Sequence, residues 1–348
     1  MRALELFAGA GGLAMGVSKA GFSHSKVVEW DEDCCATLEY NKGRAVRPVS
    51  AWSIHRGDVR AFDYSSLAHP VDLVAGGPPC QPFSLGGKHK GYNDHRDMFP
   101  EAVRAVRELR PRAFIFENVR GLLRESFSEY FEYIVLQLSY PEVKAQPKGD
   151  WTSHLAALEK YHTKGKRDGL RYHVVFRLLN AADYGVPQKR ERVFIVGFRA
   201  DQQIEWSFPE PTHSREALLA SKWADGTYWE KHRVPRTRRG VKPVMTQLSL
   251  HDGLGRSRCL PWKTVRDALD DLPDPKKTNG GGPPNHVFMP GARPYPGHTG
   301  CVLDEPAKTL KAGDHGVPGG ENMVLLDDGE LRYFTVRESA RLQCFPDD

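Results

Sequence analysis

Short apolar runs that end in glycine, proline or acidic residues organise the first part of this 348-residue chain. The first run, residues 4–7, is followed by the glycine turn AGAGG at 8–12 and then by a helical pattern that ends at Gly21. A strand, a glycine turn and a helix open a nucleotide-binding β-α-β unit, because glycine lets the backbone approach a ligand and the helix start offers free N–H groups. A glycine turn considered alone is as often an ordinary tight turn as a ligand-binding turn. The repetition of this pattern predicts an α/β fold with a mostly parallel, twisted, Rossmann-like sheet.

Two further runs place acidic residues at the ends of predicted strands. Glu29 lies twenty residues after Gly9, where a carboxylate can accept hydrogen bonds from ribose hydroxyls. Trp30 could pack on an adenine ring, although a tryptophan considered alone is more often a core residue. Asp58 could bond an adenine amine or could simply cap a turn. Nothing resembles a P-loop, which favours a nucleoside without a triphosphate.

A stiff turn, GGPPCQPFS at residues 76–84, follows an apolar run at 71–75 that is typical of a buried strand. A thiol at Cys80 would be held where a strand end meets a ligand crevice, which suits a nucleophile. The alternative is a small buried hydrophobe, as most free cysteines are. The glycine-rich, basic stretch at 85–96 could close over a substrate and contact phosphates, or could be a solvated loop.

Other charged residues follow predicted strands. Glu117 ends the run at 112–116 and should point into the same crevice as Cys80, unless it caps a helix or forms a structural ion pair. Arg190 and Arg192 should share one strand face and could brace a carboxylate, a phosphate or a carbonyl oxygen. The alternative for both arginines is a solvated strand edge.

Composition changes near residue 200, where prolines and tryptophans increase and the alternation of strands and helices is lost. The run at 231–242 holds six Lys or Arg and no acid, so it is either solvated or, beside Trp223, Tyr228 and Trp229, part of a DNA surface.

The length fits two domains, and the net charge of +5 permits a nucleic-acid partner without requiring one. No apolar run is long enough to span a membrane, and the six cysteines show no zinc-type spacing, which predicts no metal site and suits a reducing cytoplasm.

In motif content and order the chain resembles the DNA cytosine C5-methyltransferases. The motifs that carry this resemblance span nearly the whole chain. They are FAGAGG at 7–12, EW at 29–30, GGPPCQPFS at 76–84, ENV at 117–119, QKRER at 188–192 and RESARLQCFPD at 337–347.

The resemblance implies that S-adenosylmethionine is the cofactor, that duplex DNA is the substrate, and that each motif residue has a role. The implied cofactor-binding residues are Phe7, Gly9, Gly11, Gly12, Leu13, Glu29, Trp30, Asp58, Val59 and Pro79. The implied catalytic residues are Cys80 as the nucleophile, Glu117 at the cytosine N3 and amine, and Arg190 and Arg192 at the flipped base or its phosphate. The implied DNA contacts are Ser84, Lys88, Arg96, Gln188, Arg236, Arg238 and Thr309.

The family also implies a mechanism and a domain plan. Addition of the Cys80 thiolate at C6 makes C5 nucleophilic enough to accept a methyl group, with the cytosine flipped out of the duplex. Residues 1–199, joined again by 326–348, would form the catalytic domain, and 200–325 would form an irregular target-recognition domain. A Gly-Asn-Ser motif that follows in the family is not in this sequence, so the tail is expected to be truncated, disordered or on a second polypeptide.

The expected setting is the prokaryotic cytoplasm, in association with the nucleoid, as the modification enzyme of a restriction–modification pair. Two alternatives stay open. One is a methyltransferase that acts on transfer RNA, although the long 200–325 segment favours duplex DNA. The other is the large subunit of a split methyltransferase that needs a second chain for activity.

Overall fold

The computed structural model describes residues 1–79, 97–146, 150–165, 168–242, 259–278, 282–294, 296, 299–311 and 322–347. Contacts between Cα atoms divide the chain into two compact units. The first unit contains Met1–Leu178 and Arg192–Phe208, and the second contains Leu179–Glu191 and Pro209–Asp348. The C-terminal segment, expected to join the catalytic domain, is therefore grouped with the second unit, where Phe334 and Leu342 pack against Val265 and Val324.

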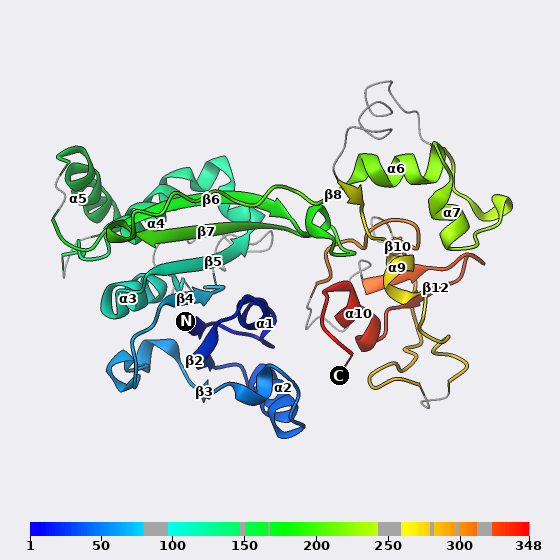
Figure 1. Cartoon of the computed structure of the whole chain (residues 1–348), viewed down its shortest axis with the longest axis horizontal. Helices are drawn as coiled ribbons and strands as arrows, with labels where there is room; N and C mark the ends of the chain where they lie inside the picture. Colours follow the sequence, from blue (N-terminus) through cyan, green and yellow to red (C-terminus); the bar gives the residue numbers. More distant parts are fainter. Residues whose placement is uncertain are drawn as a thin grey trace. The chain divides into compact units, whose positions relative to one another are not determined.

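A seven-stranded sheet dominates the first unit, with strand order β3-β2-β1-β4-β5-β7-β6 (Figure 1). Its strands are β1 (Arg2–Leu6), β2 (Ser23–Glu29), β3 (Ile54–Arg56), β4 (Leu73–Gly76), β5 (Ala113–Val119), β6 (Tyr172–Asn180) and β7 (Glu191–Arg199). Strands β1 to β5 pair in parallel, and β7 is antiparallel to β5. This arrangement confirms the predicted mostly parallel α/β sheet.

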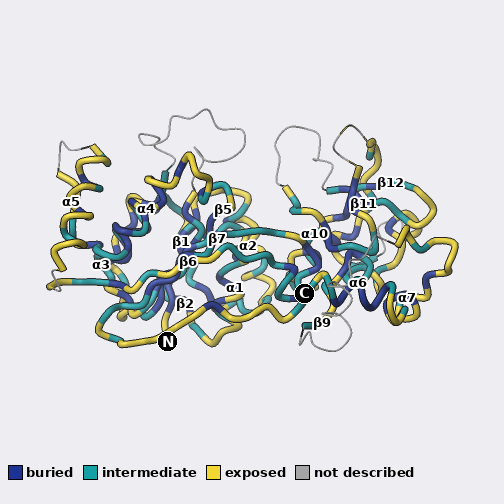
Figure 2. The backbone as a smooth tube through the Cα atoms, turned by 90° about the horizontal axis from the view of Figure 1, so that it is seen from above, coloured by how far each residue is buried: buried dark blue, intermediate teal, exposed yellow. Residues whose placement is uncertain are grey.

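Helices separate these strands along the chain and cover both faces of the sheet. They are α1 (Gly12–Lys19), α2 (Glu32–Gly43), α3 (Phe99–Leu109), α4 (Ser128–Ser139) and α5 (Trp151–Thr163). Their starts follow local rules, since Asp31 caps α2, Asp150 caps α5, and α3 carries a proline in its first turn. Figure 2 shows α5 as mostly exposed. Strands β1 and β4 are largely buried, whereas β6 is mostly intermediate or exposed.

Alternate residues of β1 serve two different cores, as the two-residue period of a strand requires. Leu4 and Leu6 belong to the main cluster with residues of α3 and α4, including Val106 and Ile134. Ala3 lies on the opposite face, in a smaller cluster with Val17 of α1. Because both faces are covered, β4 is a continuous apolar run in the sequence.

The second unit is built from short elements. Its helices are α6 (Arg215–Trp223), α7 (Thr227–Lys231), α9 (Val265–Leu269) and α10 (Val336–Leu342). Its strands are β8 (His213–Ser214), β9 (Leu260–Pro261), β10 (Cys301–Val302), β11 (Met323–Leu325) and β12 (Leu331–Tyr333). Thr335 and Glu338 form a capping box at the start of α10.

The aromatic residues beside the basic run form a core cluster of the second unit. Tyr228 is 5% exposed and Trp229 is 2% exposed, and both pack with Leu218 and Val234. Trp223 is partly buried against the same cluster, so these rings pack within the second unit, and the participation of the basic run in a DNA surface stays a prediction. No helix among the described residues is long and apolar enough to cross a membrane.

Candidate active site

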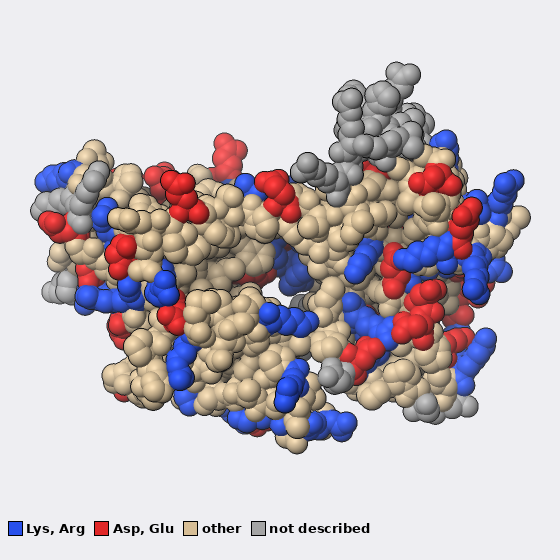
Figure 3. Space-filling model, in the orientation of Figure 1, with Lys and Arg blue, Asp and Glu red and all other residues tan. Residues whose placement is uncertain are grey.

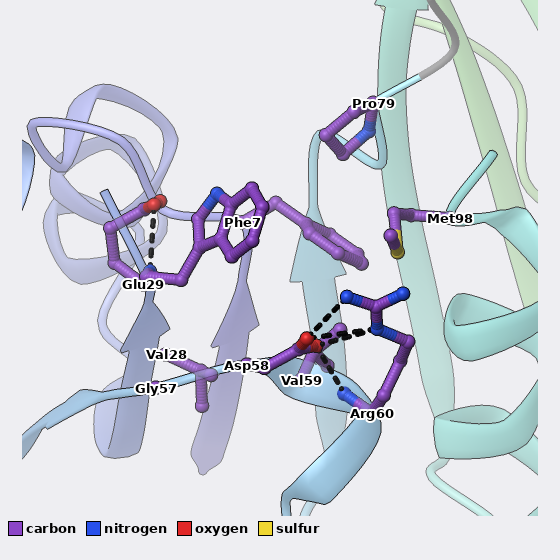
Figure 4. A pocket seen from close by; sticks show the side chains of 10 residues that line it. Phe7, Val28, Glu29, Gly57, Asp58, Val59, Arg60, Pro79 and Met98 are labelled. Atoms are coloured by element: carbon purple, nitrogen blue, oxygen red, sulfur yellow. Dashed lines mark hydrogen bonds and ion pairs between the residues drawn. The ribbon is translucent and has the colours of Figure 1, made fainter. Parts of the chain in front are cut away.

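A pocket of about 330 Å³ opens in the first unit beside the glycine turn (Figure 4). Its lining residues come from the ends of several strands and from the turns that follow them. They are Phe7, Val28, Glu29, Trp30, Gly57, Asp58, Val59, Arg60, Pro79 and Met98. A crevice beyond the carboxyl ends of parallel strands is where open α/β sheets bind ligands, and its volume is within the roughly 300–1,000 Å³ range of small-molecule sites.

The glycine turn needs backbone conformations that most residues avoid. Gly9 has φ +55° and Gly11 has φ +88°. Phe7, which lines the pocket, also has a positive φ of 55°, an unusual value for a residue with a side chain. The Gly9 backbone N–H donates to Glu29 Oε2 at 2.6 Å, so the turn is tied directly to the end of β2.

The carboxylate of Glu29 is buried and organises the backbone around it. Its Oε1 atom accepts hydrogen bonds from the N–H groups of Trp30 and Asp31, at 2.8 and 2.9 Å. Its Oε2 atom accepts the Gly9 hydrogen bond, and the side chain lines the pocket. Since a carboxylate oxygen can accept two hydrogen bonds, Oε2 retains capacity for a ligand hydroxyl.

Trp30 is 65% exposed although it lines the pocket. Its alternative interpretation as a core residue is therefore wrong. An exposed indole beside an acceptor such as Glu29 offers a flat apolar face on which an aromatic ring can stack.

Asp58 has its oxygens occupied by Arg60 in this structure, as Figure 4 shows. Oδ1 accepts the Arg60 backbone N–H at 2.9 Å, which caps the 3-10 helix η2 (Val59–Ala61). The hydrogen bonds from the Arg60 side chain hold the pKa of Asp58 below its ordinary value. Asp58 thus serves as a cap, the role that the sequence left as its alternative, while it also lines the pocket.

A second polar cluster lies at the ends of β4 and β5. Glu117 Oε1 is 2.7 Å from Nε of Arg192, and the two side chains are 28% and 18% exposed. A Cβ placed on Gly77 would lie 3.3 Å from Glu117 Oε2, so the carboxylate packs directly against the turn that follows β4. Asn118 Nδ2 donates to the carbonyl of Pro78 at 2.9 Å and fixes that same turn to β5.

This cluster joins the pocket through the proline turn. Pro79 lines the pocket, and its carbonyl accepts the backbone N–H of Met98 at 3.2 Å. The residues that surround the turn are therefore held by both β5 and the start of α3. Cys80, Ser84, Lys88 and Arg96 lie outside the described residues.

Four expected cofactor residues, Gly9, Gly11, Gly12 and Leu13, are not among those that line the pocket. Gly12 is exposed at the first position of α1. Leu13 is partly buried and packs in the cluster with Ala3 and Val17. Val59 does line the pocket, as expected.

The expected arrangement of Arg190 and Arg192 rests on both residues lying in one strand. Strand β7 begins at Glu191, so Arg190 precedes it and strand alternation does not apply. The Arg190 backbone N–H donates to Asn180 Oδ1 at 3.2 Å.

Gln188 requires a correction as a DNA contact. Its side chain is 0% exposed, and Nε2 donates to the carbonyl of Leu342 at 3.4 Å. Burial follows from a bridge between Gln188 and Ala307, which packs this segment inside the second unit. Thr309 is intermediate in exposure, and its hydroxyl donates to the carbonyl of Lys189 at 2.7 Å.

Arg236 and Arg238 are both exposed on the 3-10 helix η10 (Arg236–Arg238). Figure 3 shows acidic and basic side chains interspersed over the second unit on the face in view. The two arginines are accessible to a polyanion.

Sequence reasoning missed four pocket residues: Val28, Gly57, Arg60 and Met98. Val28, Gly57 and Arg60 are direct neighbours of residues that were identified, so the signal was available. Met98 lies apart from every motif, and nothing in its local sequence distinguishes it from a helix-start residue.

Comparison with known proteins identifies the family. A model of the C-5 cytosine-specific DNA methylases matches residues 1–141 and 156–348. The chain belongs to this family. The predicted family, fold class and enzyme class, a DNA cytosine-5 methyltransferase, are thereby confirmed.

Individual relatives agree with this membership. The methylase is 40% identical over 273 residues to the type II methyltransferase M.AquIA of Picosynechococcus sp., an alignment that covers 78% of this chain and 88% of the relative. It is 30% identical to the type II methyltransferase M.AplI of Arthrospira platensis, over 99% of this chain and 75% of the relative. The expected second polypeptide receives no support from these matches.

The fold of S. pombe Dnmt2 methyltransferase is similar, with a TM-score of 0.54 at 17% identity, over 99% of this chain and 87% of that one. This likeness supports the α/β fold described above.

Proposed function

We propose that this methylase transfers a methyl group from S-adenosylmethionine to C5 of a flipped-out cytosine in a specific duplex DNA sequence, through a covalent bond between Cys80 and C6. The observation that carries the proposal is the packing of Glu117 against the turn at Gly77, together with the Asn118–Pro78 hydrogen bond. That turn leads in the sequence to Cys80, and it also lines the pocket through Pro79.

The pocket residues fit S-adenosylmethionine. Glu29 Oε2 has acceptor capacity for a ribose hydroxyl, the exposed Trp30 offers a face for adenine, and Phe7 and Val59 supply apolar wall. Asp58 could bond the adenine amine only by sharing its oxygens with Arg60. When bound, the cofactor supplies an electrophilic methyl group on a sulfonium sulfur.

The protein supplies the activation of the base. Cytosine C5 is too weakly nucleophilic to accept a methyl group unless the Cys80 thiolate first forms a bond to C6 and breaks the aromaticity. Glu117 donates a proton to N3 as electron density moves onto the ring. Arg192, which holds Glu117 at 2.7 Å, fixes the direction of that carboxyl group. After methylation the C5 proton is lost to solvent and the N3 proton returns to Glu117, so that the C5–C6 double bond re-forms and Cys80 leaves as a thiolate.

Duplex DNA requires base flipping, since neither C6 nor N3 is accessible inside a stacked helix; unstacking costs about a few kcal/mol. We propose that the second unit reads the sequence and that Arg236 and Arg238 contact phosphates. The type II names of the relatives support a restriction–modification role. We propose that the enzyme acts on DNA in the prokaryotic cytoplasm.

One assay tests this function. The purified chain is incubated with methyl-labelled S-adenosylmethionine and either duplex DNA or transfer RNA, and the modified base is identified. We expect label at cytosine C5 of DNA, complete loss with Cys80→Ala, and retention with the matched control Cys259→Ala. Label found only in transfer RNA would contradict the DNA substrate, and label retained by Cys80→Ala would contradict the covalent route.

A further inference from the structure

A buried pair of titratable side chains lies beneath the cofactor turn and has no part in the proposed chemistry. Glu5 of β1 is 1% exposed, and His24 Nε2 lies 3.6 Å from its Oε2. Neither oxygen of Glu5 has a hydrogen-bond partner among the described residues. Burial of a lone carboxylate costs several kcal/mol, so a position of this kind calls for an explanation.

The pair continues into a chain of hydrogen bonds. His24 Nδ1 is 3.2 Å from Ser18 Oγ on α1, and Trp52 Nε1 donates to that same oxygen at 3.1 Å. An indole N–H can only donate, so the Ser18 oxygen accepts from Trp52, and its second lone pair can accept the Nδ1–H of His24. In this arrangement Nε2 of neutral His24 carries no proton and faces Glu5, so it can share the proton of the carboxyl group.

The chain ends under the glycine turn. Trp52 is 2% exposed, and a Cβ on Gly11 would lie 2.8 Å from its Cζ3. Its ring also meets His24 edge to face, with centroids 5.3 Å apart. The indole of Trp52 therefore packs closely against the glycine turn. The Gly9 N–H of this turn donates to Glu29.

We propose that Glu5, His24, Ser18 and Trp52 act as positioning residues for the cofactor-binding turn, and that the Glu5–His24 pair holds one shared proton. The inference deepens the proposed function and rests on it, because the turn is taken to bind S-adenosylmethionine. It adds that the affinity for the cofactor depends on whether the Glu5–His24 pair holds this proton.

The charge of the pair explains why one proton matters. With one shared proton the pair is neutral overall, whether as a carboxylic acid beside an imidazole or as a carboxylate beside an imidazolium. Loss of that proton leaves an uncompensated buried negative charge. Burial raises the pKa of Glu5 and the neighbouring His24 opposes that shift, so the carboxyl retains a proton to higher pH than an ordinary glutamate.

Few other groups can compensate for this charge. His24 is the titratable neighbour from β2. Ser18 from α1, Trp52 before β3 and Ala75 paired across β4 do not titrate in this range. Deprotonation should therefore disturb the contact between β1, α1 and Trp52, and with it the turn.

The test measures binding of S-adenosylmethionine by calorimetry, and the melting temperature, at pH values from just above the ordinary glutamate value of 4.5 up to about pH 9. For wild type we expect affinity to fall by about tenfold or more across this range, since each unit of pKa shift is a factor of ten. Glu5→Gln keeps a hydrogen-bonding partner for His24 but cannot titrate, so its affinity should stay flat. His154→Gln is the control, because His154 is also buried in the first unit but contacts Tyr133 and Val143 instead; it should keep the wild-type slope.

A double variant guards against simple misfolding. His24→Gln leaves the Glu5 charge unpaired and should lower the melting temperature at neutral pH, and Glu5→Gln combined with His24→Gln should recover most of that loss. An unchanged pH slope in Glu5→Gln, or no recovery in the double variant, overturns the inference while cofactor binding stands. Absence of binding by the wild type at every pH overturns the proposed function, and the cofactor role of this chain falls with it.

Discussion

Single residues at the strand ends set how closely the parts of the site can approach. At Gly76 an added Cβ would lie 2.4 Å from the carbonyl oxygen of Leu6, so β1 and β4 admit only glycine there. Gly16, within α1, has nothing within 4 Å of the same position. Nothing in the local sequence distinguishes Gly76 from Gly16, and their different surroundings are visible only in the structure.

These two glycines make a matched pair of substitutions. Gly76→Ala should lower the free energy of unfolding by about 2–3 kcal/mol, because the strand must move to relieve the clash. Gly16→Ala should raise it by about 0.5–1 kcal/mol, because alanine costs less entropy in a helix. Urea unfolding measures both, and equal effects of the same sign would contradict the close approach of β1 and β4.

Glu29 gives a second prediction at this scale. Glu29→Gln replaces one acceptor oxygen by an N–H₂ group that would face backbone donors at Gly9 or at Trp30 and Asp31. We expect the affinity for S-adenosylmethionine to fall by about tenfold to a hundredfold, from a lost charge-assisted bond and an unsatisfied donor. Calorimetry checks this, with Glu32→Gln as the control, since Glu32 is exposed and bonds Arg56 instead. Equal affinity of both variants would remove Glu29 from the cofactor site.

The position of Glu29 was predictable because a carboxylate at the end of a strand, at a fixed distance from a glycine turn, has a known ligand chemistry. The burial of Gln188 was not, because it depends on a bridge to Ala307, more than a hundred residues away in the sequence. The same holds for the His24–Ser18–Trp52 chain, whose members look unremarkable in isolation.

Strands were easier to predict than helices. The seven strands of the sheet correspond to apolar runs or strand-like segments in the sequence, and their ends differ by a few residues. Helices α2 and α4 were not identified. Helix α2 buries only Cys35 and Leu38, and α4 is apolar on most sides, so neither shows a clear period of 3.6.

The start of α10 offers a prediction at the scale of elements. Thr335 Oγ1 accepts the Glu338 backbone N–H at 3.2 Å, lies 2.9 Å from His286 Nδ1, and is almost wholly buried. Thr335→Ala should reduce the free energy of unfolding by about 1–2 kcal/mol, whereas Thr335→Ser should keep most of it. Val336→Ala, at an exposed position of the same helix, is the control. A loss with serine as large as that with alanine would mean that the methyl group, and not the cap, stabilises α10.

Buried carboxyl groups in the two units should respond differently to acid. In the second unit, burial alone would raise the pKa of Asp267, but hydrogen bonds from His232 and Lys231 outweigh it and the net shift is downward. A side-chain hydrogen bond from Arg266 likewise lowers the pKa of Asp327. In the first unit the pKa of Glu5 is raised by burial instead.

The sign of each shift gives the direction of the effect. A carboxylate with a lowered pKa contributes stability above its ordinary value of 3.8, and that contribution is lost as the pH falls through the lowered pKa. For Glu5, stability is present below 4.5 and is lost as the pH rises through the raised pKa. Hydrogen exchange between about pH 4 and about pH 2 should therefore show β11, β12 and α9 losing protection before β1 and β4 do. Simultaneous loss in both units would contradict this assignment.

Domain organisation was the least predictable property at this scale. A change of composition near residue 200 indicated a second part of the chain, and contacts divide the chain at 178, 191 and 208. The grouping of the C-terminal segment with the second unit depends on Phe334 and Leu342 meeting Val265 and Val324, a pairing that no local pattern encodes.

The covalent step is tested most directly by trapping. A duplex that carries 5-fluorocytosine at the target position lacks the C5 proton whose loss would release the enzyme. Incubation with S-adenosylmethionine, followed by denaturation and peptide mass spectrometry, should therefore locate the DNA adduct on Cys80, and no adduct should form with Cys80→Ala. An adduct on another cysteine, or efficient methylation of ordinary duplex with no trapped complex, would contradict the account.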